Sequence, residues 1–154
     1  MILYDADLAG NFIFFIRAND PNHRFMVLRK ALYAYRIKQR GGSIELLHSR
    51  EEIQDLLRKY GIRFVAVSDD IPLRFISQRD LREMLLTPQF RLLDKFPLSD
   101  SENAAHSGNL LIYENLAWAP PTEKYLDIKM LTLPRDIVVP LEGFDWKTGA
   151  PEQR

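Results

Sequence analysis

The most regular pattern of apolar and polar positions in this chain lies in residues 43–70. Ser49, followed three residues later by Glu52, is a capping-box pair that predicts the start of a helix. Gly61 predicts the end of that helix, because a glycine adopts the left-handed conformation of a C-cap most easily. Between these ends, apolar side chains recur at helical spacing, at Ile53, Leu56, Leu57 and Tyr60.

Mostly apolar runs at residues 44–47 and 62–67 flank this helix, so the segment predicts a β-α-β unit with a right-handed crossover. Upstream, the chain predicts a strand at residues 2–4 and a helix at about residues 11–18. Apolar residues occupy nearly every face of that second helix. We therefore expect it to be buried on several sides or packed against a partner.

The segment between these two regions is less regular. Residues 25–28 predict a strand. Residues 30–40 predict an irregular helix, although Tyr33 and Tyr35 alternate there as they would in a strand.

Further elements follow residue 70. Ser77 with Asp80 predicts a third capped helix. Residues 90–96 alternate partly, like an edge strand, and residues 110–114 form another apolar strand.

The pattern changes after residue 116. Two prolines indicate an extended linker, and the strands after it, at residues 126–133 and 137–141, predict a hairpin. The sequence thus predicts an α/β fold: a three-layer, mostly parallel sheet built from β-α-β units, with a C-terminal β-hairpin extension. We divide the chain into an α/β domain at residues 1–116, a linker and hairpin packed on it at residues 117–141, and a flexible tail at residues 142–154.

Composition excludes several classes of function. The chain has 154 residues, of which 46% are apolar and 27% charged, as in a soluble globular domain. Its 21 basic residues balance its 21 acidic ones, so no net charge favours nucleic acid. Cysteine is absent, which excludes disulfides, thiol catalysis and metal sites with cysteine ligands. The sequence predicts no membrane span and no signal peptide. Because Ile2 already reads as part of a strand, either the strand begins at the N-terminus or Met1 is an internal start.

Two pairs of carboxylates follow predicted strands. Asp5 and Asp7 come after the first strand, and Asp69 and Asp70 come after the strand at residues 62–67. Since ligands of open parallel sheets bind at the carboxyl ends of the strands, these four aspartates are the candidate ligand or metal site. Asp5 and Asp7 have the spacing of a Mg²⁺ site, although the alternative that they cap the next helix is favoured by the residues that follow. For Asp69 and Asp70, the alternative is that both are loop residues exposed to solvent.

The remaining polar residues predict no further site. Arg17 closes an apolar helix, where it is either a snorkelling end residue or the ion-pair partner of an aspartate. His23, His48 and His106 lack the spacing of metal ligands, and no serine lies in a nucleophile turn. The sequence identifies no catalytic residue and no metal ligand with certainty.

Several short sequence motifs in the chain are similar to those of a known family. They are Tyr4-Asp5, Gly10-Asn11-Phe12-Ile13-Phe14-Phe15-Ile16-Arg17, Asp20-Pro21, Val27-Leu28-Arg29-Lys30, Leu32-Tyr33, Tyr60-Gly61-Ile62-Arg63-Phe64-Val65-Ala66-Val67, Tyr113-Glu114 and Ile137-Val138-Val139-Pro140-Leu141. With these, residues 3–141 resemble the soluble C-terminal domain of bacterial polytopic membrane glycosyltransferases similar to dolichyl-phosphate-mannose-protein mannosyltransferases.

The resemblance implies a location and a partner. In such enzymes a membrane-embedded part binds a polyprenyl-phosphate sugar, and the soluble domain lies beside it on the extracytoplasmic face. The chain would then be a non-catalytic, membrane-associated domain or fragment whose partner is the missing membrane-embedded portion of the same protein. No catalytic residue is carried over, because the catalytic loop of the family has no counterpart in this sequence.

Two other functions remain open. One is a free-standing, metal-dependent phosphohydrolase-like enzyme that uses Asp5 and Asp7 with Mg²⁺. The other is a ligand- or protein-binding module, including a homodimer formed through the edge strand near residues 90–96 or through the terminal hairpin.

Overall fold

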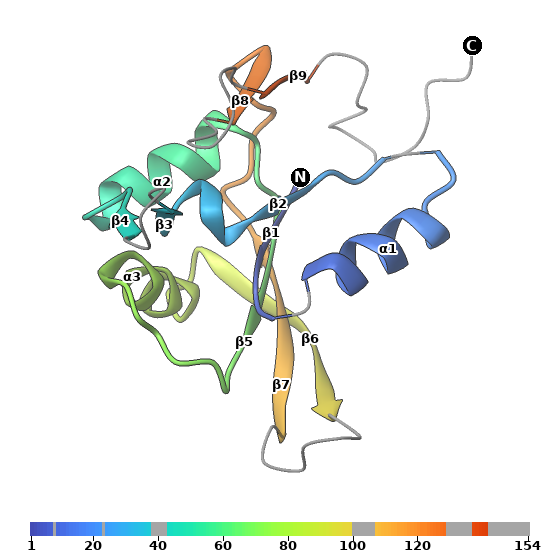
Figure 1. Cartoon of the computed structure of the whole chain (residues 1–154), viewed down its shortest axis with the longest axis vertical. Helices are drawn as coiled ribbons and strands as arrows, with labels where there is room; N and C mark the ends of the chain where they lie inside the picture. Colours follow the sequence, from blue (N-terminus) through green and yellow to red (C-terminus); the bar gives the residue numbers. More distant parts are fainter. Residues whose placement is uncertain (8, 23, 38–42, 100–106, 129–136, 142–154) are drawn as a thin grey trace.

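A five-stranded sheet in the order β2-β1-β5-β7-β6 organises the computed structural model, which describes residues 1–7, 9–22, 24–37, 43–99, 107–128 and 137–141 (Figure 1). Its strands are β1 (Ile2–Asp5), β2 (Val27–Arg29), β5 (Phe64–Ser68), β6 (Phe90–Ser99) and β7 (Ser107–Asn115). Strand β1 runs parallel to both β2 and β5, whereas β7 is antiparallel to β5 and β6. The predicted α/β class is confirmed, with a mixed sheet of three parallel strands and an antiparallel hairpin.

The β-α-β unit predicted at residues 43–70 is wrong in its first strand. Strand β4 (Ser43–Glu45) pairs antiparallel with β3 (Tyr35–Ile37) in a separate two-stranded sheet. Its central residue, Ile44, is 41% exposed, so this short strand has little apolar surface to bury in the main sheet. The parallel neighbours of the main sheet come from the β1-α1-β2 segment instead.

The helix predicted within residues 43–70 is confirmed as α2 (Arg50–Lys59). The Ser49 hydroxyl accepts a hydrogen bond from the backbone N–H of Glu52 at 3.2 Å, and the Glu52 carboxylate accepts one from the N–H of His48 at 2.6 Å. Gly61 follows the helix with φ of +55°. These local contacts explain why the helix could be predicted at both ends.

The irregular helix predicted at residues 30–40 is wrong over most of its length. The described part contains one 3₁₀ turn, η1 (Lys30–Leu32), followed by β3. Tyr33 and Ala34 are fully buried between them. Tertiary burial of this pair overrides the helical spacing, and residues 38–40 lie outside the described residues.

The predicted N-cap of α3 (Ile76–Leu85) is wrong, although the helix itself is confirmed. Phe75 occupies the N-cap position, and Ser77 is fully buried in the first turn. The N–H of Ser77 donates to the Glu45 carboxylate at 2.7 Å, so a side chain from β4 serves this helix terminus. The anchor of α3 is therefore a residue distant in the sequence.

Helix α1 (Ala9–Asn19) confirms the predicted helix; it is not buried on several sides, and the alternative, packing against a partner, stays a prediction. None of its residues is fully buried. Phe12 and Ile16 pack against a cluster that contains Ile2, Tyr4 and Ala66. The other side of the helix leaves Phe14 and Phe15 exposed to solvent.

The helices lie on opposite sides of the sheet. Apolar residues of α2 and α3, including Ile53, Leu57 and Leu81, share one core cluster with Leu3 and Val65. The residues that α1 covers belong to a second cluster, which contains Ile2 and Ala66. Because neighbouring strand residues point to opposite faces, Leu3 and Ile2 mark the two faces. Figure 1 shows α2 and α3 on one side of the sheet and α1 on the other. No helix among the described residues is both long enough and apolar enough to cross a membrane.

The predicted edge strand is β6, and it is longer than expected. It interrupts its pairing with β7 at a bulge between Leu92 and Asp94, and it contains Pro97. Beyond the sheet, β8 (Tyr125–Ile128) and β9 (Ile137–Pro140) form the predicted antiparallel hairpin. Leu126 and Leu141 join the main core cluster. Residues 129–136 and the predicted tail at 142–154 lie outside the described residues.

Glu114 ties the parallel and antiparallel parts of the sheet together. Its carboxylate accepts hydrogen bonds from Arg91 at 2.6 Å and from Arg63 at 3.0 Å, and these two bonds hold the Glu114 pKa below its ordinary value.

The lowered pKa of Glu114 predicts a loss of stability in acid. As the pH falls, the unfolded chain, with an ordinary glutamate pKa, is protonated at this carboxyl before the folded chain is. We expect the free energy of unfolding to decrease as the pH drops below about 4.5, the ordinary pKa of a glutamate carboxyl. In urea titrations at several pH values, Glu114→Gln should make this decrease in stability shallower. An unchanged decrease would show that Glu114 is not its cause.

Candidate functional site

The carboxyl ends of β1 and β5 lie side by side at one edge of the sheet. Asp5, the last residue of β1, is in register with Val67, one residue before the end of β5. Helix α3 contributes Gln78 and Arg82 to this edge, and their spacing of four residues places both on one side of the helix. Together these elements form the candidate site.

Asp5 is fully buried, and its carboxylate is held by three side chains. Tyr33 donates its hydroxyl proton at 2.5 Å, Gln78 donates from Nε2 at 3.0 Å, and Arg82 donates from its guanidinium at 2.9 Å. The same guanidinium reaches the backbone oxygens of Asp5 and Ser68, at 3.1 and 3.5 Å. Arg82 thus connects α3 to the ends of both parallel strands. We call these four side chains the Asp5 network.

The network fixes the protonation state of its tyrosine. Burial raises the pKa of Tyr33 well above its ordinary value, and the negative charge of Asp5 raises it further. The Tyr33 hydroxyl therefore remains a hydrogen-bond donor at neutral pH. It does not act as a base.

Asp7 points away from this network. Its side chain is 77% exposed and lies 3.5 Å from the ammonium group of Lys30. Its backbone oxygen accepts a hydrogen bond of 2.6 Å from the Tyr4 hydroxyl. Asp5 and Asp7 are only two positions apart, yet Asp5 is buried and Asp7 is exposed to solvent.

Asp69 and Asp70 accept hydrogen bonds from residues of β7 and β5. Asp69 accepts hydrogen bonds from the backbone N–H and the side-chain amide of Asn109, at 2.5 and 2.8 Å. The backbone hydrogen bond is the main cause that lowers the pKa of Asp69. Asp70 accepts a hydrogen bond from the Ser68 hydroxyl at 2.5 Å and lies directly over Gly108.

The four aspartates therefore have separate partners. Within the part of the chain that the structure describes, no three histidine, cysteine or acidic side chains gather in a way that would hold a metal ion. Arg17 is exposed at the end of α1, and no ion pair joins it to another described residue. His48 is exposed, and His23 and His106 lie outside the described residues.

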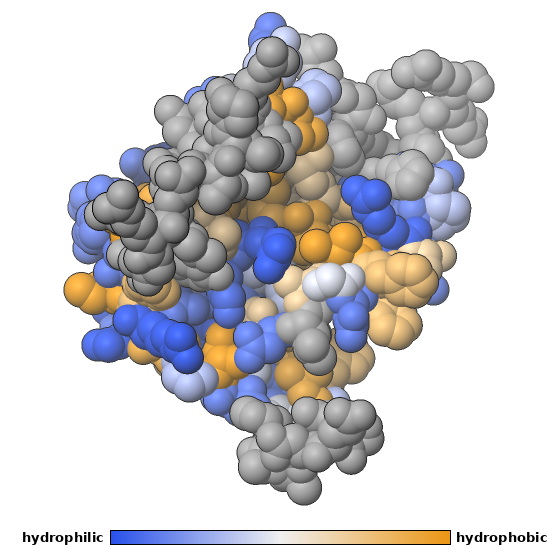
Figure 2. Space-filling model, viewed as in Figure 1, coloured by the Kyte–Doolittle hydropathy of each residue, from blue (hydrophilic) through white to orange (hydrophobic). Residues whose placement is uncertain are grey.

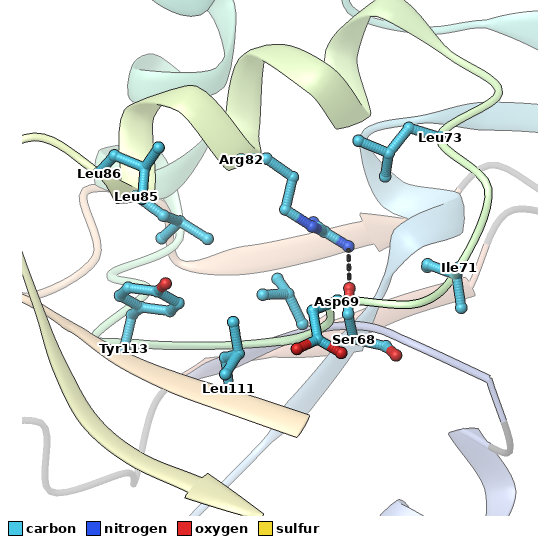
Figure 3. A pocket seen from close by; sticks show the side chains of 10 residues that line it. Ser68, Asp69, Ile71, Leu73, Arg82, Leu85, Leu86, Leu111 and Tyr113 are labelled. Carbon is cyan, nitrogen blue, oxygen red and sulfur yellow. Dashed lines mark hydrogen bonds between the residues drawn. The ribbon is translucent and has the colours of Figure 1, made fainter. Parts of the chain in front are cut away.

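A pocket of about 230 Å³ opens beside the network, between α3 and the sheet (Figure 3). Its polar lining consists of Ser68, Asp69, Arg82 and Tyr113. Its apolar lining consists of Val67, Ile71, Leu73, Leu85, Leu86 and Leu111. Burial raises the pKa of Tyr113, so its hydroxyl stays protonated at neutral pH. A cavity with more apolar than polar lining residues suits a small, mostly apolar group.

Sequence reasoning missed most of this site. Tyr33, Gln78, Arg82 and Tyr113 were not singled out as functional residues. The available indication was the polar pair Gln78 and Arg82 on the side of α3 that also carries the apolar residues Leu81 and Leu85. The chain matches no family model, no curated protein and no solved structure.

Proposed function

We propose that this chain is a non-catalytic domain of a membrane glycosyltransferase-like protein. The observation that supports a non-catalytic role is the saturation of the Asp5 network. A catalytic carboxylate needs an oxygen that can reach a substrate, a proton or a metal. Both Asp5 oxygens already accept hydrogen bonds, and the Asp5 side chain has no exposed surface.

The same contacts disfavour the phosphohydrolase alternative. A Mg²⁺ ion on Asp5 would have to displace Arg82, which lies 2.9 Å from the carboxylate. Asp7 is exposed to solvent instead, with its carboxylate 3.5 Å from the Lys30 ammonium group. A cation held by Asp5 and Asp7 together would therefore require the strand end to rearrange.

The membrane part of the proposal comes from the sequence resemblance. Under it, the domain lies on the extracytoplasmic face, and its partner is the membrane-embedded portion of the same protein. We include the three-layer arrangement in this proposal. It is supported by the position of α1 on one face of the sheet and of α2 and α3 on the other. The gene sequence upstream of the Met1 codon tests the proposal, because it should encode a series of apolar spans. An isolated gene with its own ribosome-binding site would contradict it.

Calorimetry with Mg²⁺ tests the non-catalytic role. We expect no saturable heat at neutral pH, because the Asp5 carboxylate is already paired with Arg82. Asp7→Asn is the matched variant, since it removes an exposed carboxylate and leaves the Asp5 network intact. Saturable binding that disappears in Asp7→Asn would overturn the proposal in favour of a metal-dependent enzyme.

A ligand-binding role is the second candidate, and the pocket beside Arg82 supports it. Leu111→Trp places a larger side chain in the pocket wall and should abolish binding of small apolar fragments, observed as chemical-shift changes of the pocket residues. Fragments that shift the spectra of parent and variant equally would contradict a site in this pocket.

A further inference from the structure

Helix α1 exposes two phenylalanine rings to solvent. Phe14 and Phe15 are 69% and 64% exposed, more than any other phenylalanine in the described ranges. Their rings meet edge to face, with centroids 6.2 Å apart. Figure 2 shows apolar surface over α1, beside hydrophilic atoms. Adjacent exposed aromatic rings of this kind mark a contact surface more often than isolated apolar residues do.

The stretch of sequence that contains α1 carries a net positive charge. Residues 7–30 contain four basic and two acidic residues, a net charge of +2, whereas the whole chain has a net charge of 0. Arg17 follows Phe14 by three positions and so lies on the same side of the helix. Arg29 is in register with Tyr4, which packs on the α1 side of the sheet. Both arginines are exposed, and neither is ion-paired to another described residue.

This combination identifies the chemistry of the partner. A second copy of the chain is disfavoured, because α1 contains no acidic residue and two copies would bring their arginines together. An exposed apolar pair on a face that also carries two exposed arginines instead matches the boundary between lipid headgroups and acyl chains in an anionic membrane. Aromatic rings occupy that boundary, and arginine side chains extend from it to headgroup phosphates.

We propose that α1 docks on the surface of a bilayer that carries anionic lipids. Phe14 and Phe15 enter the headgroup region, and Arg17 and Arg29 lie against phosphates. This inference rests on the proposed function and supplies a contact surface for the membrane-adjacent role. The inference can nevertheless be refuted while the proposed non-catalytic function stands. A chain that binds no lipid and still lacks saturable Mg²⁺ binding would refute this inference and leave the non-catalytic function standing.

Flotation of the 154-residue chain with vesicles tests the inference. The chain should bind vesicles of phosphatidylcholine with about one-third phosphatidylglycerol, bind pure phosphatidylcholine more weakly, and dissociate as salt is added. Phe14→Ser with Phe15→Ser should lower the partition coefficient at least about tenfold. Arg17→Gln should lower it about fivefold, on anionic vesicles only.

The matched control is Leu92→Ser with Phe96→Ser on β6, where both side chains are 48% exposed. This variant should bind as the parent does, and circular dichroism should show both double variants folded. No binding of the parent to anionic vesicles, or equal losses in the two double variants, would overturn the proposal. Phe15→Trp gives a second measurement, since its emission should shift to the blue on anionic vesicles; an unchanged emission would also overturn it.

Discussion

Asp5→Asn is expected to lower the free energy of unfolding by about 3–5 kcal/mol, the cost of breaking a buried ion pair by removing one partner. The substitution keeps the size of the side chain but leaves the largely buried Arg82 guanidinium without its carboxylate. The amide that replaces the carboxylate also has fewer acceptor sites for Tyr33 and Gln78. Urea unfolding followed by circular dichroism measures the loss.

Asp7→Asn is the control for this prediction. It changes the same residue type two positions away, but at a side chain that is 77% exposed, so we expect a change within about 0.5 kcal/mol. The double variant Asp5→Asn with Arg82→Met should recover part of the loss of Asp5→Asn, because it removes the guanidinium left unpaired while the asparagine oxygen still accepts a hydrogen bond from Tyr33 or Gln78. Equal effects of Asp5→Asn and Asp7→Asn would show that the network does not stabilise the fold.

Gly61→Ala is expected to cost about 2–5 kcal/mol, combining about 1–2 for the left-handed backbone with about 1–3 for overpacking. Gly61 has φ of +55°, and an added Cβ would lie 2.7 Å from both the ring Cδ and the backbone nitrogen of Pro121. The linker residue Trp118 also depends on this turn, since its indole N–H donates to the Gly61 carbonyl oxygen at 3.0 Å. Accepting the added Cβ would therefore require Pro121 to shift away from the turn to which Trp118 is bonded.

Gly10→Ala is the matched control, measured by the same urea titration. Nothing lies within 4 Å of a Cβ added to Gly10, and the residue is in the first turn of α1. We expect this variant to be as stable as the parent or more stable by up to about 1 kcal/mol. A loss in Gly10→Ala as large as that in Gly61→Ala would show that backbone geometry at Gly61 is not the cause.

The features that the sequence predicted well are local ones. The ends of α2 depend on Ser49, Glu52 and Gly61, which lie within or next to the helix and act through contacts a few residues apart. The strands β1, β5 and β7 have short, mostly apolar runs that are typical of buried strands. For these elements, short-range chemistry and tertiary burial favour the same structure.

The features that the sequence did not predict depend on distant residues. Tyr33, Gln78 and Arg82 are 28, 73 and 77 positions away from Asp5. Nothing in the spacing of these residues indicates that they meet. The pairing of β4 with β3 and the position of Glu45 at the start of α3 depend in the same way on the packing of the whole domain. The aspartates at the strand ends were placed at the correct edge of the sheet, but the side chains that bind them were not foreseen.

The interior position of β1, second in the five-stranded sheet, has a consequence for truncated forms of the chain. In the described sheet β1 lies between β2 and β5, so its loss would leave β2 without a strand neighbour and β5 with an unpaired edge. That edge would carry Val65, Ala66 and Val67, a short β-prone run without charge. Such an edge is a template for strand addition between molecules. Proteolytic removal of residues 1–5 should therefore lead to aggregation rather than to a smaller folded domain.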